Sequence, residues 1–198
     1  MSTNDAATNG ISDSSNSDAA ATSQMWLVEE VVAGLPAVPK TDTQSPVPFF
    51  HMLERLKTTK REGWRRFGID RGESISDHMY RMSLITMFAP ESLATKLNIP
   101  HCTKMALIHD MAEALVGDIT PVDGVAKHEK NRRESTTMDY FTKKLLGRVN
   151  GGLTGQQIMD IWQEEEFWAG KDHLVYTENV KPDEKKLEQT DEYYGKDK

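Results

Sequence analysis

The segment Met105–Pro121, with the sequence MALIHDMAEALVGDITP, combines the apolar spacing of a core helix with residue types that bind metals. Its apolar residues recur at intervals of three and four, which predicts that they share one helical face. They are Met105, Ile108, Ala112 and Leu115. Gly117 favours a helix end, and Pro121 prevents an immediate restart. We therefore expect one helix over 100–116, followed by a turn.

Three residues that can ligate a metal interrupt this face. Glu113 lies four residues after His109 and three after Asp110, so their side chains should project from one end of the same helix. Asp118 adds a carboxylate in the turn. A His-Asp pair alone is more often an ordinary histidine or a solvated edge than a metal site. The added acids are costly to bury unpaired, and a helix C-terminus prefers cations, so together they favour a metal site.

A helix upstream supplies another histidine. Residues 73–89, ESISDHMYRMSLITMFA, carry apolar side chains at helical spacing. Ser74 is the expected N-cap, and Asp77 three residues later resembles a capping box. His78 should therefore lie in the first turn of this helix. Two helices are then available to surround one ion, which a single helix cannot do.

These segments resemble the HD-domain metal-dependent phosphohydrolases, and within them the 5'-deoxynucleotidase subgroup. The resemblance runs from about residue 49 to about residue 166. It is carried by RLKTTKREGW, ESISDHMYRM, HDMAEALVGDITPVDG, KHEKNRRE and IWQEEE, in this order. It implies an all-α fold, an HD-domain helical bundle. No stretch alternates apolar and polar residues as a strand would, which agrees with that class.

The resemblance also implies roles for individual residues. The metal ligands would be His78, His109, Asp110, Glu113, Asp118, the backbone carbonyl of Ile119 and Asp183. Glu113 and Asp118 would be catalytic, since they would orient the attacking water. Arg61 and Trp64 would bind substrate, and a guanidinium suits a phosphate because it can donate two hydrogen bonds to it. A mixed nitrogen and oxygen ligand set suits Mn, Co or a similar divalent metal, with a second ion such as Mg.

The last ligand is the point at which the chain departs from the family pattern. The corresponding stretch is VKPDEKKLEQTDEYY, residues 180–194, which contains Pro182 and one extra residue. Counting from its start places Glu184 at the ligand position, whereas the local chemistry favours Asp183. The part of the chain from about residue 167 is therefore divergent or truncated, which bears on activity and leaves the fold class unchanged.

Composition excludes several classes of protein. The formal net charge of -7 over 198 residues gives no basic excess for a general nucleic-acid binder. Cys102 is the only cysteine, so no disulfide framework is expected. No apolar run approaches membrane-spanning length, and the N-terminus resembles neither a signal nor a transit peptide. We expect a cytoplasmic protein, with the nucleus as the second option.

The chain divides into two parts. Residues 1–46 should form a disordered tail and a Pro-rich linker, and residues 47–198 the HD domain. Within the first part, WLVEEVV (26–32) is a short amphipathic segment that should dock on the domain. Within the second, the charged run HEKNRRE (128–134) is expected to be a solvated helix face.

Two functions follow from the resemblance. The first is metal-dependent hydrolysis of deoxyribonucleoside 5'-monophosphates to deoxynucleoside and phosphate, by a protein that forms a homodimer. The second is a degraded, catalytically impaired HD domain that binds a nucleotide or a partner protein. Completion of the metal site by Asp183 or Glu184 distinguishes the two.

Overall fold

The structure, a computed structural model, describes residues 25–164. Within this range every regular element is helical, and the only β-type pairing is an isolated bridge between Lys60 and Ser74. The elements are α1 (Val28–Ala33), α2 (Val47–Leu53), α3 (Arg55–Thr58), α4 (Glu62–Arg66), α5 (Ile75–Met87), α6 (Glu91–Ala94), α7 (Ile99–Ile108), α8 (Glu113–Val116), α9 (Lys127–Asp139), a π-helical turn η1 (Tyr140–Leu145) and a 3₁₀ turn η2 (Val149–Gly152). A last helix occupies 153–164. The predicted all-α class is confirmed.

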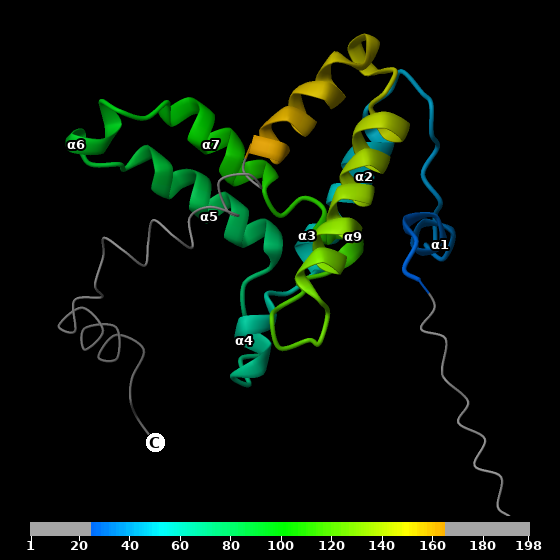
Figure 1. Cartoon of the computed structure of the whole chain (residues 1–198), viewed down its shortest axis with the longest axis horizontal. Coiled ribbons are helices and arrows are strands. Elements are labelled where there is room, and N and C mark those ends of the chain that lie inside the picture. The colour runs from blue at the N-terminus through cyan, green and yellow to red at the C-terminus, as the bar shows by residue number, and fades with distance from the viewer. Residues whose placement is uncertain (1–24, 165–198) are drawn as a thin grey trace, which may run out of the picture.

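Two groups of helices meet at the centre of the molecule. α5 and α7 lie side by side as a long hairpin closed by α6, and α2, α3 and α9 form the bundle that receives the inner ends of this hairpin (Figure 1). α4 is a separate short helix that projects from this junction (Figure 1). The start of α4, the start of α5 and the end of α7 are therefore brought to one region of the molecule.

The core lies where α2, α9 and η1 meet. Phe141 and Met138 are completely buried, and Phe49 is 4% exposed. The rings of Phe49 and Phe141 pack edge to face, with centroids 5.9 Å apart. The sequence places these residues at helical spacing with Leu56 and Leu145, which are also buried. The helical spacing of apolar residues predicts burial correctly in this region because the apolar face of each helix packs into one core.

Phe141 should be a large contributor to stability. Phe141→Ala removes a fully buried ring, so we expect it to lower the free energy of unfolding by about 3–5 kcal/mol. Phe67→Ala is the matched control because that ring is 85% exposed, and it should change stability by less than about 0.5 kcal/mol. Urea denaturation followed by circular dichroism measures both. Equal losses in the two variants would contradict this core.

The predicted start of α5 is confirmed. The hydroxyl of Ser74 accepts a hydrogen bond from the backbone N–H of Asp77 at 3.1 Å. The carboxylate of Asp77 in turn accepts from the Ser74 backbone N–H at 2.8 Å, which completes a capping box. The backbone N–H and the hydroxyl of Ser74 both donate to this carboxylate, which lowers the pKa of Asp77 below its ordinary value. The cap fixes the first turn, from which His78 projects.

The prediction of one helix over 100–116 is wrong. α7 ends at Ile108, and α8 begins at Glu113. Between them the backbone is tightened into turns, with hydrogen bonds from Met111 N–H to the Ile108 carbonyl at 3.0 Å and from Glu113 N–H to the Asp110 carbonyl at 3.0 Å. Backbone hydrogen bonds between residues three apart replace those between residues four apart, so the chain here makes a turn with fewer residues than an α-helix does. His109 and Glu113 therefore leave the backbone from two separate helices.

The N-terminal amphipathic segment docks on the bundle, as expected. Val28 and Val32 of α1 are each 5% exposed and belong to the main core. A guanidinium N–H of Arg132 donates to the Trp26 carbonyl at 2.7 Å, and the Arg133 guanidinium lies 5.9 Å from the Trp26 ring centre. The boundary at residue 47 stays a prediction, and the expected disordered residues 1–23 lie outside the described range.

Candidate metal and phosphate site

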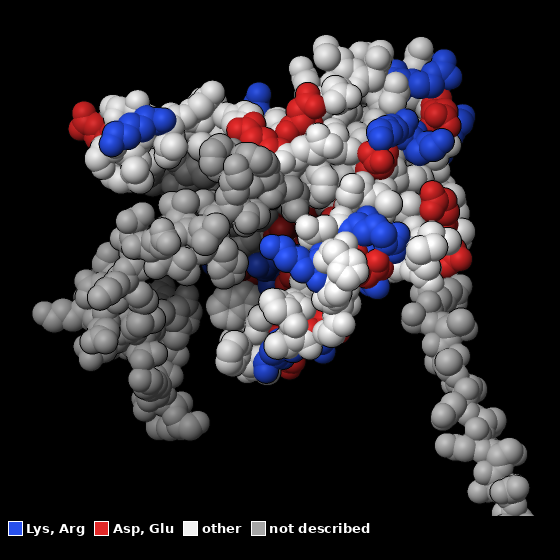
Figure 2. All heavy atoms as spheres, viewed as in Figure 1, with Lys and Arg blue, Asp and Glu red and all other residues white. Residues whose placement is uncertain are grey.

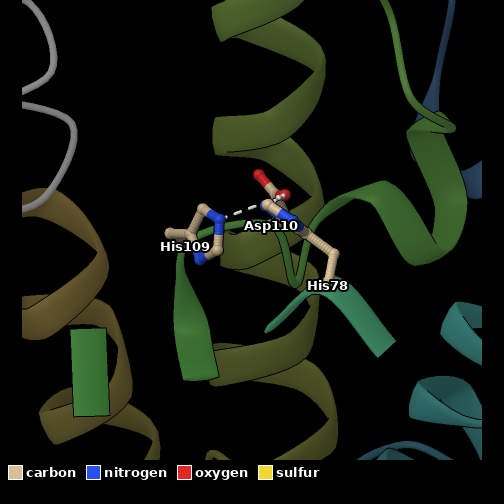
Figure 3. A group of neighbouring side chains, drawn as sticks. All are labelled: His78, His109 and Asp110. Atoms are coloured by element: carbon tan, nitrogen blue, oxygen red, sulfur yellow. Dashed lines mark ion pairs between the residues drawn. The ribbon is translucent and has the colours of Figure 1, made fainter. Parts of the chain in front are cut away.

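The candidate site begins with three side chains that point toward one another, His78 from α5 and His109 and Asp110 from the end of α7 (Figure 3). One ligand atom from each lies within 4.8 Å of the others. His109 Nε2 is 3.1 Å from Asp110 Oδ2, and His78 Nε2 is 3.7 Å from the same oxygen. The structure therefore brings together the first three residues that the sequence predicts as metal ligands.

The protonation of His109 supports a cation at this point. Its Nδ1 is 3.0 Å from the Ala106 carbonyl, which can only accept, so Nδ1 carries the proton. In a neutral imidazole Nε2 then presents a lone pair, which faces the Asp110 carboxylate. Two acceptors at 3.1 Å need a proton or a metal between them. Two ligands at about 2.1 Å from one ion and at right angles to each other are about 3 Å apart, so the spacing suits a metal.

Asp110 stays ionised in this surrounding. Burial alone would raise its pKa, but the nearby His109 and the positive charge of Arg61 hold the pKa of Asp110 below its ordinary value. Burial, followed by the charge of Arg61, lowers the pKa of His78. An ionised carboxylate beside a neutral imidazole is the protonation state that metal ligation requires.

Arg61 connects the metal-ligating triad to the other predicted acids. Its Nη1 lies 3.2 Å from Asp110, 3.5 Å from Asp118 and 3.9 Å from Glu113. Asp118 is held in place because its Oδ2 accepts from the Glu62 backbone N–H at 2.8 Å. Arg61 begins α4 as its N-cap, so the guanidinium reaches the site from a different side than the histidines.

Glu113 is the most unusual of these acids. It is 2% exposed, and its Oε2 is buried without a hydrogen-bond partner. Burial, followed by the negative charges of Asp110 and Asp118, raises its pKa to about 9. A buried, unsatisfied carboxylate oxygen next to two further acids is the arrangement expected where a cation or a substrate completes the site.

Trp64 lies beside the site on α4. Its indole N–H donates to Glu73 Oε1 at 3.3 Å. A Cβ atom added at Gly72 would fall 2.5 Å from the Trp64 Cβ, so the absence of a side chain at Gly72 makes room for this residue. Ile119 follows Asp118 in an irregular segment, and its carbonyl ligand role stays a prediction. Asp183 and Glu184 lie outside the described residues.

One cation of the site is not predicted by the sequence. The charged run 128–134 predicts a solvated face for Lys130 and Glu134 on α9, but Glu134 is 7% exposed and its Oε1 lies 3.5 Å from Lys130 Nζ. Burial alone would lower the pKa of Lys130, but the negative charges of Glu134, Glu113 and Asp110 raise it. The solvated-face prediction is therefore wrong for Glu134, whereas the Lys130 side chain is 33% exposed. The signal was the helical spacing from Lys130 through Glu134 to the buried Met138.

Three known proteins are similar in sequence to this chain. The chain is 46% identical over 122 residues to the 5'-deoxynucleotidase hdd1 of Schizosaccharomyces pombe, which covers 62% of this chain and 60% of that protein. It is 42% identical over 142 residues to the 5'-deoxynucleotidase YBR242W of Saccharomyces cerevisiae, covering 69% and 57%. For the 5'-deoxynucleotidase HDDC2 of Homo sapiens the identity is 37% over 123 residues, covering 62% and 56%. The chain thus spans less than two thirds of the length of these relatives.

Among solved structures, the HD domain-containing protein YGK1 aligns with a TM-score of 0.45 and 25% sequence identity, covering 78% of each chain. The family model described as HD domain matches residues 53–194. This match covers most of the sequence and includes both predicted ligand-bearing segments. The chain therefore belongs to the HD domain family.

Proposed function

We propose that this chain is a metal-dependent 5'-deoxynucleotidase, a phosphoric monoester hydrolase that converts deoxyribonucleoside 5'-monophosphates to deoxynucleoside and phosphate. The observation that carries the proposal is the convergence of His78, His109 and Asp110 beside an arginine and two further acids. The names of the similar fungal and human proteins support the same activity and are the only support for a deoxyribose preference.

The residues present fit a divalent transition metal. Two imidazoles and a carboxylate give the mixed nitrogen and oxygen set that suits Mn, Co or a similar ion. The unpartnered Oε2 of Glu113 and the carboxylate of Asp118 offer further oxygens for a second ion such as Mg. When bound, such an ion polarises a phosphoryl oxygen and lowers the pKa of water. Within the proposal, the last ligand comes from Asp183 or Glu184.

The remaining residues bind the phosphate and orient the water. In the hydrolysis, water attacks phosphorus and gives up a proton, the bond from phosphorus to the ester oxygen breaks, and the leaving oxygen gains a proton. Arg61 would hold the phosphate, because its guanidinium already lies among the acids that face the metal-ligating triad. Asp118, fixed by the Glu62 N–H, would orient the water. Glu113, which lies with Asp118 around the guanidinium of Arg61, would help to orient the water.

The charges favour a substrate with one phosphate. Among the described residues, Arg61 forms ion pairs with three acids of the site, and the charges of Glu113 and Asp110 act on Lys130, whose pKa they raise. This small set of cations suits a monophosphate better than a triphosphate. On the face drawn in Figure 2, basic and acidic side chains are interspersed. Together with the net charge of -7, this supports a small-molecule substrate and no nucleic-acid partner.

The proposal also covers the extent of the domain, the oligomeric state and the cellular location. Residues 47–198 form the HD domain, which the family match over 53–194 supports. The resemblance favours a homodimer. Among residues 25–164, no helix is long and apolar enough to cross a membrane. The proposed cytoplasmic location, or a nuclear one, accords with a sequence whose single cysteine, Cys102, leaves no disulfide framework.

The test is phosphate release by the full-length protein, loaded with Mn or Co, from all deoxyribonucleoside and ribonucleoside monophosphates. We expect release from the deoxy compounds, and none from the same protein after chelation. A deoxynucleoside triphosphate and a cyclic dinucleotide serve as competing substrates. Faster cleavage of either would contradict the proposal, as would calorimetric binding of a monophosphate without any phosphate release, which is the behaviour of an impaired binding domain.

A further inference from the structure

We propose that Glu73 is a positioning residue that couples His78 of the metal-ligating triad to Trp64 through one carboxylate oxygen. Glu73 Oε1 accepts a hydrogen bond from the Trp64 indole N–H at 3.3 Å and lies 3.7 Å from His78 Nδ1. The Glu73 side chain is 15% exposed. The role of Trp64 at the substrate side rests on the proposed function, whereas the role of Glu73 at His78 does not.

The two histidines of the triad present the same arrangement. Each directs Nε2 toward Asp110 and Nδ1 away from it. The Nδ1 of His109 donates to the Ala106 carbonyl at 3.0 Å, and the Nδ1 of His78 faces the Glu73 carboxylate. At 3.7 Å the second contact is longer than a hydrogen bond, but Glu73 is the acceptor that this nitrogen faces. An acceptor behind the ring fixes the proton on Nδ1 and leaves the Nε2 lone pair for the metal.

Glu73 is itself anchored from two directions. Its second oxygen forms an ion pair with Arg81, which lies one turn after His78 on α5. Its backbone carbonyl accepts from the Arg61 N–H at 3.1 Å, and the next residue, Ser74, is the N-cap of α5. The carboxylate therefore has a fixed position relative to both α5 and the start of α4.

One oxygen can serve both partners. A carboxylate oxygen has two lone pairs, so Oε1 can accept from the indole of Trp64 and from the imidazole of His78 together. Trp64 has little freedom to move away, since its Cβ lies against Gly72. Metal binding at His78 should strengthen the contact of its Nδ1–H with Oε1 and so change the environment of the Trp64 indole, which shares this oxygen. A purely structural carboxylate would not make this connection.

The variant Glu73→Gln tests whether the carboxylate of Glu73 positions His78 and Trp64. A glutamine offers one acceptor oxygen, whereas Arg81 on one side and the pair of Trp64 and His78 on the other each need an acceptor. The variant keeps the shape of the side chain and loses the charge. We expect the affinity of the full-length protein for Mn or Co, measured by competition with a chelator, to fall about 10-fold or more. The matched control is Glu91→Gln, which removes an exposed charge from α6 and should change metal affinity by less than about 2-fold.

Two readouts test positioning rather than folding. In the metal-free protein, nitrogen NMR of the imidazoles should show His78 as the Nδ1–H tautomer, and Glu73→Gln should shift it toward a mixture. His78→Gln identifies the His78 signal. The fluorescence of Trp64, isolated by subtracting the spectrum of Trp64→Phe, should change when the metal is added to the wild-type protein and should not change in Glu73→Gln.

Each outcome decides the inference. Unchanged metal affinity and an unchanged His78 tautomer in Glu73→Gln would overturn it, as would equal losses in Glu91→Gln. A tautomer change without any metal-dependent Trp64 signal would overturn the coupling. If Glu73→Gln unfolds, Glu73→Asp keeps the charge at a greater distance and should give an intermediate affinity. None of these readouts uses phosphate release, so failure of the proposed hydrolysis would be recognised separately.

Discussion

His109→Ala should abolish metal binding by the full-length protein. The wild-type chain, purified without chelator, should contain close to one transition-metal ion, because His78, His109 and Asp110 converge within 4.8 Å. Removal of His109 takes away the ligand nearest to Asp110, at 3.1 Å. Loss of an outer partner of a ligand typically costs about 10–100-fold in affinity, so loss of the ligand itself should cost more than about 100-fold. Elemental analysis and a phosphate-release assay measure the two consequences.

The control for this variant is His51→Ala, which removes an exposed histidine of α2 and should keep both the metal and the activity. The His109 side chain also bonds to the Ala106 carbonyl, so circular dichroism must show that the helical content is unchanged. His109→Gln, which retains a polar side chain of similar length, provides a second variant. Full metal stoichiometry in folded His109→Ala would count against the metal-ligating triad.

Glu113→Gln should have opposite effects on activity and on stability. The wild-type carboxyl has a pKa of about 9 in the folded protein against an ordinary value of 4.5 in the unfolded chain. The folded state therefore keeps a proton that the unfolded state releases, so the stability contributed by this group is complete below about pH 4.5 and is lost as the pH rises toward 9. Glutamine does not titrate and is free of this loss.

The size of this stability loss follows from the width of the pH interval over which the wild-type protein is compared with the variant. One pH unit corresponds to at most about 1.4 kcal/mol, so between about pH 5 and about pH 8 the metal-free wild type should lose up to about 4 kcal/mol relative to the variant. Urea unfolding in the presence of EDTA at the two pH values measures this difference. Phosphate release by the metal-loaded variant should fall by about 100-fold or more, since a carboxylate that would hold the second ion and orient the water is removed. Parallel stability curves for the two proteins would contradict the raised pKa of the buried Glu113 carboxyl.

The sequence predicted the parts of the site that depend on neighbours a few residues apart. The capping box at Ser74 and Asp77 involves residues three apart, and the core face through Met138 and Phe141 follows one helical period. These contacts can be predicted from the sequence because the interacting groups lie within one helical turn of each other. The pairing of His109 with Asp110 was visible for the same reason. The helical break after Ile108 was not, because i to i+3 bonds and i to i+4 bonds suit the same apolar spacing.

Only the tertiary structure placed residues that are far apart in the chain. Arg61 meets Asp110 across 49 residues of sequence, and the Glu62 N–H meets Asp118 across 56. The negative charges of Glu113 and Asp110 raise the pKa of Lys130 because α9 packs against α8. The charged sequence around Lys130 would otherwise be typical of a solvated surface. The raised pKa of Glu113 has the same origin, since burial and neighbouring charge are properties of the folded protein. The sequence by itself thus determined the helices, their caps and the ligand types, which depend on local hydrogen bonds and periodicity. The fold decided the electrostatic environment and the shared contacts of Glu73, which exist only once separate helices are packed together.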